Sequence, residues 1–388
     1  SSHGVSRAML QGLFNYVRVY GPWSLNVVEG GASDQRLPDT RVWKGDGIIA
    51  RVPNNEAARD ILRSRLPAVL INPSDAYLDP AHPLSACSRI QFDSRAIGAL
   101  AAEHLLGRTP RQFAFVGHPD DPNWSRWRRE AFVARLAQAG AACEVYPLPP
   151  AAKRDWSAER PRLCAWLKRL RKPAAVFAAN DSRGRHVLDA CLVADLAVPY
   201  EVTVLGVNND PLICETCIPP LSSIAVDDEM AGYEAAQLLD RLMQGLEPPG
   251  RVVRYGPKEV VSRASTADLQ LSDKLVIQAL EFIRINSGLN IRVSDVAEHL
   301  GVTPRWAENR FKHALGRSLH QEIHQVRMAT AQKMVSSTRQ PFTEIATRCG
   351  FRSVNHLCKL FRETYGVTMG QLRSSGEDAP LSDRKSVV

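Results

Sequence analysis

Short apolar runs alternate with helical patterns over residues 1–265. The runs are four or five residues long and rich in valine, isoleucine, phenylalanine and alanine, as buried strands are. They lie at 47–50, 68–72, 89–92, 112–116, 174–178 and 203–207. The stretches between them place apolar residues three and four positions apart, at 55–65, 94–106, 125–138 and 183–194. This alternation predicts βα units and a parallel sheet.

The two ends of this region depart from the pattern. The chain opens on SSHGVSRAMLQGLFNYV, a helix-like segment with no strand before it. Because a doubly wound domain normally begins with a strand, we expect that strand in residues ahead of Ser1. At the other end, a Pro/Gly-rich patch at 247–250 precedes a last strand-like run at 252–255.

The pattern changes at residues 262–273, whose sequence SRASTADLQLSD is polar and rich in small residues. Such a composition is typical of linkers. Beyond it the strand signals stop, and helices separated by short turns follow. We therefore predict an α/β domain at 1–265, a linker at 266–274, a helical domain at 275–374 and a disordered tail at 375–388.

The helical domain contains an internal repeat. The motif A-x-x-L-G at 297–301 returns as A-x-x-C-G at 346–350, and a hydroxyl residue followed eight positions later by phenylalanine returns as well (Thr303 with Phe311, Ser353 with Phe361). Glycine can adopt a positive φ in a turn, and threonine or serine can cap the next helix. Each copy therefore predicts a helix-turn-helix unit, whose second helix enters the major groove of DNA.

The second helix of each unit has an outer face suited to base edges and phosphates. We predict an inner stripe of Ala307, Phe311, Ala314 and Leu315 in the first, and of Leu357, Leu360 and Phe361 in the second. The predicted DNA contacts are Arg305, Glu308, Asn309, Lys312, Val354, Asn355, Cys358 and Lys359. Arginine and lysine suit guanine or phosphate, asparagine suits adenine, and valine or cysteine can contact a thymine methyl. The alternative is that these residues form only the exposed face of a helical bundle. That alternative would explain a single copy of the repeat, but it explains two copies less well than DNA binding does.

Charge supports a nucleic-acid partner for the helical domain alone. Residues 269–374 carry 15 Lys/Arg against 8 Asp/Glu, whereas residues 1–268 carry 32 against 30. A basic segment beside a neutral one indicates a polyanion partner for the basic part, although it could also serve solubility. The long helix predicted at 319–335 would space the two units for successive major grooves, about 34 Å apart.

Residues 293–373 resemble the DNA-binding domain of the AraC/XylS family. The residues that carry the resemblance are Ile345, Ala346, Cys349, Gly350, Phe351, Leu357, Phe361, Arg362 and Gly366. Met369 and Leu372 stand where the family usually has Pro and Tyr, and Ala307 and Asn309 replace a common Leu and Arg. The latter pair puts the base preference of the first recognition helix in doubt, but not the fold.

Residues 1–265 resemble the LacI-type periplasmic-binding-protein fold. The motifs are FDSRAIG at 92–98, FAFVG at 113–117, AAND at 178–181, LGVNND at 205–210 and PPLSSI at 219–224. The two resemblances together imply an α/β, two-lobed, periplasmic-binding-protein-like sensor followed by an all-α double helix-turn-helix DNA-binding domain.

A set of polar residues follows the predicted strands of the sensor, where ligands of such folds bind. They are Asp93, Asn180, Asp181, Asn208 and Asn209. Carboxylates and amides suit the paired hydroxyls of a neutral sugar. The alternative for the two Asn-containing pairs is turn chemistry after a strand.

The resemblance adds Arg128 as a sugar-contacting arginine and Trp156 as an aromatic cover for the apolar face of a sugar. The alternative for Arg128, with Arg126 and Arg129, is a solvated basic helix face. The alternative for Trp156 is a core aromatic that anchors the surface.

A sensor of this type joined to an AraC-type domain is similar to the architecture of xylose-responsive activators. The resemblance implies an operator DNA, D-xylose as the first choice of effector, a homodimer and, for an activator, contact with RNA polymerase. Another pentose, a hexose or another small metabolite stays open as the effector. So does a sugar-acting enzyme that would use Asp93 and Asp181 as an acid/base pair.

Other features exclude further classes of function. No run approaches 18 consecutive apolar residues and no signal peptide opens the chain, so we expect no membrane association and a cytoplasmic location. The eight cysteines are irregularly spaced, and Cys214-x-x-Cys217 has no second pair or histidine at zinc spacing. We expect neither a metal nor a cofactor.

Overall fold

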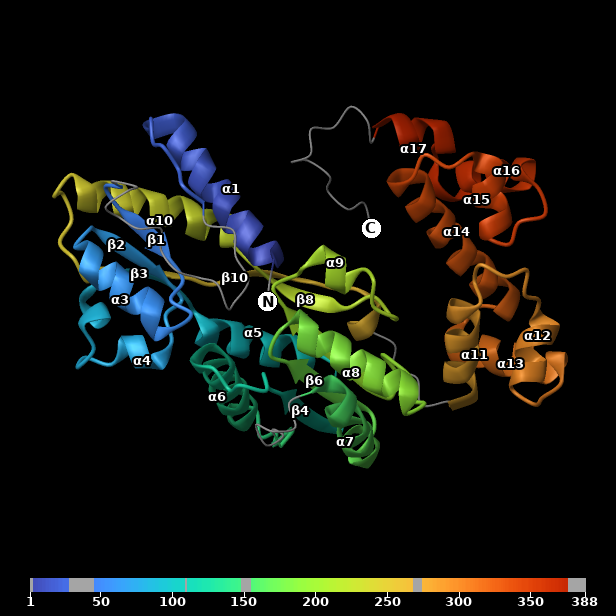
Figure 1. Ribbon diagram of the computed structural model, residues 1–388. Helices are drawn as coiled ribbons and strands as arrows, with labels where there is room; N and C mark the ends of the chain where they lie inside the picture. Colours follow the sequence, from blue (N-terminus) through green and yellow to red (C-terminus); the bar gives the residue numbers. More distant parts are fainter. Residues whose placement is uncertain (1–2, 28–44, 109, 148–154, 268–273, 376–388) are drawn as a thin grey trace. The chain divides into compact units, whose positions relative to one another are not determined.

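The computed structural model describes residues 3–27, 45–108, 110–147, 155–267 and 274–375 (Figure 1). The chain divides into two compact units, Ser1–Asp268 and Leu269–Val388. Most of the predicted linker at 266–274 and almost all of the predicted tail at 375–388 lie outside the described residues.

Lobe 1 of the first unit is built on a parallel four-stranded sheet in the order β1-β2-β3-β9. Its strands are β1 (Ile48–Ala50), β2 (Ala68–Ile71), β3 (Ser88–Phe92) and β9 (Val252–Tyr255). Val69 and Ile71 pack with α1 (His3–Tyr20) and α10 (Asp228–Met243) on one face. Leu70 packs on the other face with α3 (Asn55–Ser64), α4 (Asp75–Leu78) and η1 (Pro83–Ala86).

The opening helix is confirmed as α1, which lies along α10 although more than 200 residues separate the two (Figure 1). Glycines allow the close approach of the two backbones. A Cβ at Gly12 would lie 1.8 Å from the backbone oxygen of Glu229, and one at Gly232 would lie 1.9 Å from that of Met9. The strand predicted ahead of Ser1 lies outside the described residues.

Lobe 2 contains a six-stranded sheet in the order β10-β8-β7-β6-β4-β5, with β10 antiparallel to β8. Its strands are β4 (Gln112–Val116), β5 (Cys143–Val145), β6 (Ala174–Ala178), β7 (Val202–Val207), β8 (Ser222–Val226) and β10 (Pro257–Val261). One face is covered by α5 (Ser94–Leu106) and α6 (Asn123–Gln138). The other is covered by α7 (Trp156–Arg169), α8 (Asp181–Val193) and α9 (Pro211–Cys214).

The chain crosses between the two lobes three times, from β3 to α5, from β8 to α10 and from β9 to β10. The six predicted strands of 1–207 and the last run at 252–255 are all confirmed, within one residue at each end. The sequence did not predict the strands β5, β8 and β10 or the helices α4, α7, α9 and α10.

The second unit consists of helices in its described residues (Figure 1). They are α11 (Lys274–Ile285), α12 (Val293–His299), α13 (Pro304–Leu315), α14 (Leu319–Ser337), α15 (Phe342–Arg348), α16 (Val354–Tyr365) and α17 (Met369–Ser375). The repeat is confirmed as two helix-turn-helix units. Gly301 and Gly350 have φ of 65° and 71° in the turns. The Thr303 and Ser353 side chains cap the second helices by accepting hydrogen bonds from the N–H groups of Trp306 and His356.

The end of the first unit is fixed to lobe 2 by a buried hydroxyl network in η3 (Ala264–Thr266). Ser265 Oγ donates to the Val204 carbonyl at 2.6 Å, and Thr266 Oγ1 donates to Ser222 Oγ at 2.7 Å. From the end of α5, Arg108 Nε donates to the Thr266 carbonyl at 2.7 Å, and His104 Nε2 lies 3.4 Å from Thr266 Oγ1. We call this set the exit anchor.

Candidate ligand site and DNA-binding surface

Arg128 is buried where the two lobes meet. It extends from α6, is 2% exposed, and donates from Nη1 to the Ala179 carbonyl at 2.6 Å. Its guanidinium carbon lies 5.0 Å from the centre of the Trp124 ring and 5.6 Å from that of Phe92. Burial lowers the pKa of Arg128 to about 10, and the nearby carboxyl groups of Asp181 and Asp228 oppose this shift. Among the described residues, its Nε has no hydrogen-bond partner.

Asp181 lies close enough to Arg128 to raise the pKa of the guanidinium, but both of its oxygens are already used. They accept hydrogen bonds from the N–H of Asp210 at 2.8 Å and from Ser223 Oγ at 2.5 Å. Burial raises the pKa of Asp181 to about 7, whereas these hydrogen bonds lower it. Asp181 therefore joins the ends of three strands in lobe 2.

Two other predicted ligand residues are helix caps. Asp93 Oδ1 accepts from the N–H of Ala96 at the start of α5, and Asn180 Oδ1 accepts from the N–H of Arg183 at the start of α8, both at 2.9 Å. Asn208 and Asn209 both have positive φ values, 104° and 51°, as turn residues after a strand do. Asn209 differs from the rest, because among the described residues its buried Oδ1 has no hydrogen-bond partner.

Trp156 begins α7 and stacks on His186 of α8, with ring centroids 4.0 Å apart and an interplanar angle of 9°. Beneath this stack, Arg183 and Glu159 form a bidentate ion pair at 2.7 and 2.9 Å that is almost fully buried. One face of the Trp156 ring is therefore occupied by His186. The rings in contact with Arg128 are those of Trp124 and Phe92, which the sequence did not single out.

The structure brings further residues to Arg128 from lobe 1. We call the whole set the interlobe cluster, and it comprises Arg51, Phe92, Trp124, Arg128, Asp228 and Tyr255. Tyr255 Oη accepts from Asn72 Nδ2 at 2.9 Å, and its ring lies 4.5 Å from that of Phe92. Burial raises the pKa of Asp228 to about 7, although Arg51 and Arg128 act in the opposite direction. Aromatic faces, two guanidiniums and one carboxylate are groups with which proteins bind polyhydroxylated ligands.

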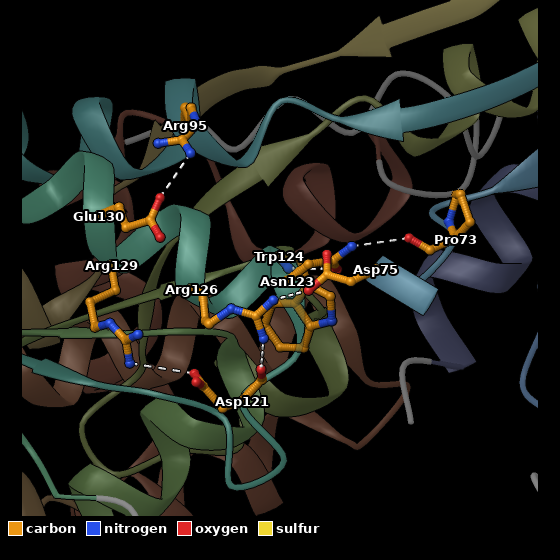
Figure 2. Close-up of polar contacts among 9 residues, drawn as sticks. All are labelled: Pro73, Asp75, Arg95, Asp121, Asn123, Trp124, Arg126, Arg129 and Glu130. Carbon is orange, nitrogen blue, oxygen red and sulfur yellow. Dashed lines mark hydrogen bonds and ion pairs between the residues drawn. The ribbon is translucent and has the colours of Figure 1, made fainter. Parts of the chain in front are cut away.

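The first turns of α6 connect the two lobes beside this cluster (Figure 2). Asn123 Nδ2 donates to the Pro73 carbonyl in lobe 1, and Arg126 pairs with Asp75 and donates to the Asp121 carbonyl. Arg129 pairs with Asp121 at 3.4 Å. Arg126 and Arg129 are thus engaged in ion pairs.

Six of the eight predicted DNA contacts are exposed on the second helices of the two units. They are Arg305, Asn309 and Lys312 on α13 and Asn355, Cys358 and Lys359 on α16. Val354 is half-buried against the core of the second helix-turn-helix unit. Leu357 and Phe361 are buried as predicted, but Ala314, expected in the inner stripe, is exposed.

Glu308, which the sequence predicts to contact DNA, makes a contact within the second unit. Its Oε2 accepts a hydrogen bond from the backbone N–H of Leu319 at 3.0 Å, and the residue is half-buried. Leu319 is the first residue of α14, where backbone N–H groups lack partners within the helix. Glu308 therefore fixes the start of α14 to α13.

Other chemistry has little support in the described residues. They contain no group of three metal-ligating side chains, and none of their helices is long and apolar enough to span a membrane. The cysteines are free, and Cys214 and Cys217 are both buried.

Two family models match the chain. A periplasmic binding protein-like domain matches residues 102–266, and a helix-turn-helix domain matches residues 296–375. Together with the fold, these matches define a transcription regulator in which a binding-protein-like sensor is joined to a DNA-binding domain. The alternative of a sugar-acting enzyme is thereby excluded.

Relatives identify the family. The xylose operon regulatory protein of Haemophilus influenzae is 31% identical over 332 residues, which cover 84% of this chain and 84% of that protein. The Escherichia coli K12 protein of the same name is 28% identical over 97% of this chain and 95% of its own length. The chain belongs to the family of xylose operon regulatory proteins.

Solved structures agree. The xylose-binding transcription activator xylR has a TM-score of 0.82 at 28% identity, covering 97% of this chain and 96% of that chain. A LacI-type regulator from Alkaliphilus metalliredigens complexed with D-xylulofuranose, at 17% identity, covers 69% of this chain and 96% of its own. Its TM-score of 0.54 shows a shared fold.

Proposed function

We propose that this regulator binds D-xylose between its two lobes and activates transcription in response. The observation that carries the proposal is the buried Arg128. Its Nε has no hydrogen-bond partner in the described part of the chain, and its guanidinium lies against two aromatic rings. A guanidinium donates to hydroxyl oxygens, and aromatic rings cover the apolar face of a sugar. The names of the H. influenzae and E. coli relatives favour xylose over other sugars.

Among the predicted ligand residues, Arg128 and Asn209 have the strongest support, because each holds a buried polar atom that no other described residue pairs with. Asp93, Asn180, Asp181 and Asn208 are proposed to line the same site from the ends of strands. Trp156 has the least support among the predicted ligand residues, because the His186 ring already stacks on one face of its indole.

For DNA, we propose that α13 and α16 enter major grooves and present Arg305, Asn309, Lys312, Val354, Asn355, Cys358 and Lys359. We propose the domain boundaries 1–265, 266–274 and 275–374, which agree in outline with the two compact units. We further propose a cytoplasmic homodimer on two neighbouring sites that contacts RNA polymerase. These last features rest on the resemblance of the sensor to LacI-type regulators and of the helical domain to AraC-type regulators.

Calorimetric titration of the full chain with D-xylose, L-arabinose, D-ribose and D-glucose tests the effector. We expect D-xylose to bind most tightly, and Arg128→Ala to abolish binding while operator binding survives. Arg129→Ala is the matched control, because Arg129 follows on the same helix but pairs with Asp121. Preferential binding of a sugar phosphate or a nucleobase would reject xylose as the effector.

A further inference from the structure

Asp228 is a buried carboxylate that the fold does not satisfy. It is the first residue of α10, directly after the chain crosses from β8 in lobe 2 to lobe 1, and it is 5% exposed. Among the described residues, its Oδ1 has no hydrogen-bond partner. The helix does not need this carboxylate as a cap, because Asp227 Oδ1 already accepts from the N–H of Met230. An unpaired buried carboxylate oxygen costs stability, so its presence calls for a functional reason.

Across the lobes, Arg128 supplies the complementary group. Its Nε is a buried donor that no described residue pairs with, on a side chain whose charge acts on Asp228. Within the described residues, the unpaired acceptor on lobe 1 is Asp228 Oδ1, and the unpaired donor on lobe 2 is Arg128 Nε. The two side chains are close enough for the charge of Arg128 to lower the pKa of Asp228. A hydroxyl group both donates and accepts, so a ligand with neighbouring hydroxyls can satisfy both atoms.

The surroundings of Asp228 define what such a ligand can be. Phe92 and Trp124 supply apolar faces beside Arg128, and Tyr255 Oη, which accepts from Asn72, retains its own proton to donate. Arg51 and Arg128 are the cations near Asp228, and Asp227 is a second carboxylate. Asp181 adds a further carboxylate near Arg128. Asp227 is partly exposed and pairs with Lys258, whereas Asp228 and Asp181 are buried. An anionic ligand would meet these two buried carboxylates, where repulsion is weakly screened.

We propose that Asp228 is a ligand-binding residue that selects a neutral polyhydroxylated effector, its Oδ1 accepting a hydrogen bond from a ligand hydroxyl while Arg128 donates to the same ligand from the other lobe. The proposal rests on the proposed sugar-binding function and adds a residue and a selectivity to it. Asp228 would thus repel anionic ligands and would also connect lobe 1 to lobe 2 through the bound ligand.

This role predicts opposite effects on stability and on binding. Asp228→Asn removes a buried charge, so the ligand-free protein should unfold at a higher temperature than the wild type. The amide is a weaker acceptor, so the variant should bind D-xylose at least about ten-fold more weakly. A residue with a purely structural role would lose stability when replaced and leave the affinity of the folded protein unchanged.

The test measures thermal unfolding and calorimetric titration of the full chain for wild type, Asp228→Asn and Asp227→Asn, with D-xylose and the anion D-xylonate. Asp227→Asn removes the same charge one residue earlier, and we expect its xylose affinity to stay within about three-fold of wild type. Asp228→Asn should also narrow the preference for xylose over xylonate.

Three results would overturn the assignment: unchanged xylose affinity in Asp228→Asn, lower ligand-free stability of that variant, or wild-type binding of xylonate as tight as that of xylose. If the wild type bound no sugar, the proposed function would fail first. The ligand-free unfolding temperatures would then still decide whether Asp228 is a strained functional group or a structural one.

Discussion

Asn123 Nδ2 lies 3.1 Å from the backbone oxygen of Pro73, so a side chain of lobe 2 is hydrogen bonded to the backbone of lobe 1 (Figure 2). Asn123 is buried, and one helical turn further on Arg126 pairs with Asp75. Both contacts lie at the start of the helix that carries Arg128. Any movement that separates the lobes must therefore break them.

We predict that Asp75→Asn weakens sugar binding by about two- to five-fold, because a partly exposed ion pair between the lobes contributes up to about 1 kcal/mol. Glu130→Gln is the control. Glu130 pairs with Arg95 at 2.8 Å, within lobe 2, and is similarly exposed. Calorimetry should show weaker sugar binding for Asp75→Asn and wild-type affinity for Glu130→Gln. Equal affinities of the two variants would mean that the Arg126–Asp75 ion pair does not stabilise the arrangement of the lobes that binds sugar.

Asn355 and Lys312 should differ in what they contribute to DNA binding. Asn355→Ala should relax discrimination at one or two base pairs, at a cost of about 1–3 kcal/mol on the preferred site, since an amide can bind adenine bidentately. Lys312→Ala should weaken all sequences about equally and reduce the dependence of affinity on salt. Selection of bound sites from a random library separates the two outcomes, and an unchanged site for Asn355→Ala would remove it from base readout.

Replacement of Glu308 should affect folding and leave base recognition unchanged. Glu308→Ala leaves the N–H of Leu319 without its partner, and loss of a helix cap costs about 1 kcal/mol. Thermal unfolding of the full chain should show a lower transition for the DNA-binding unit, and site selection should return the wild-type motif. If Glu308→Ala instead changed the selected DNA site and left the unfolding temperature unchanged, Glu308 would be a DNA-contacting residue.

Acidification should loosen the exit anchor through His104. Burial, reinforced by the charge of Arg108, lowers the pKa of His104 to about 4, below the ordinary histidine pKa of 6.5 that we take for the unfolded chain. Its contribution to stability is therefore present above pH 6.5 and is lost as the pH falls toward 4. We expect His104 to account for a loss of about 1–3 kcal/mol in the free energy of unfolding on acidification, allowing for its partial exposure. Unfolding measured from pH 7.5 to 4 should show that His104→Gln loses less stability than wild type, whereas His313→Gln, at an exposed position, follows wild type.

Continuous apolar runs made most of the sheet predictable. The runs at 112–116 and 174–178 became β4 and β6 at the predicted residues, because a strand buried on both faces needs an unbroken apolar sequence. β8 has no such signal. Its first two residues, Ser222 and Ser223, are buried polar groups whose hydroxyls bond to Thr266, Arg263 and Asp181, and no local pattern reveals partners so distant in the chain.

The candidate site was predictable on the side of lobe 2 and hidden on the side of lobe 1. Arg128 was identified from the resemblance alone. Asp228 and Tyr255 were missed because the crossing after β8 and the end of β9 bring them to Arg128, although they lie at least 100 residues away in the sequence. Conversely, Asp93 and Asn180 were correctly placed after strands, but caps use the same residue types in the same place.

The exit anchor determines which part of the sensor carries the DNA-binding unit. α5 begins at the first crossing between the lobes and ends at the side chains that hold Thr266, only two residues before the first unit ends. If ligand binding rotates the lobes, lobe 2 and Thr266 would turn as one body, because hydrogen bonds join the end of α5 to η3. Such a rotation would be transmitted rigidly as far as Thr266, close to the end of the first unit.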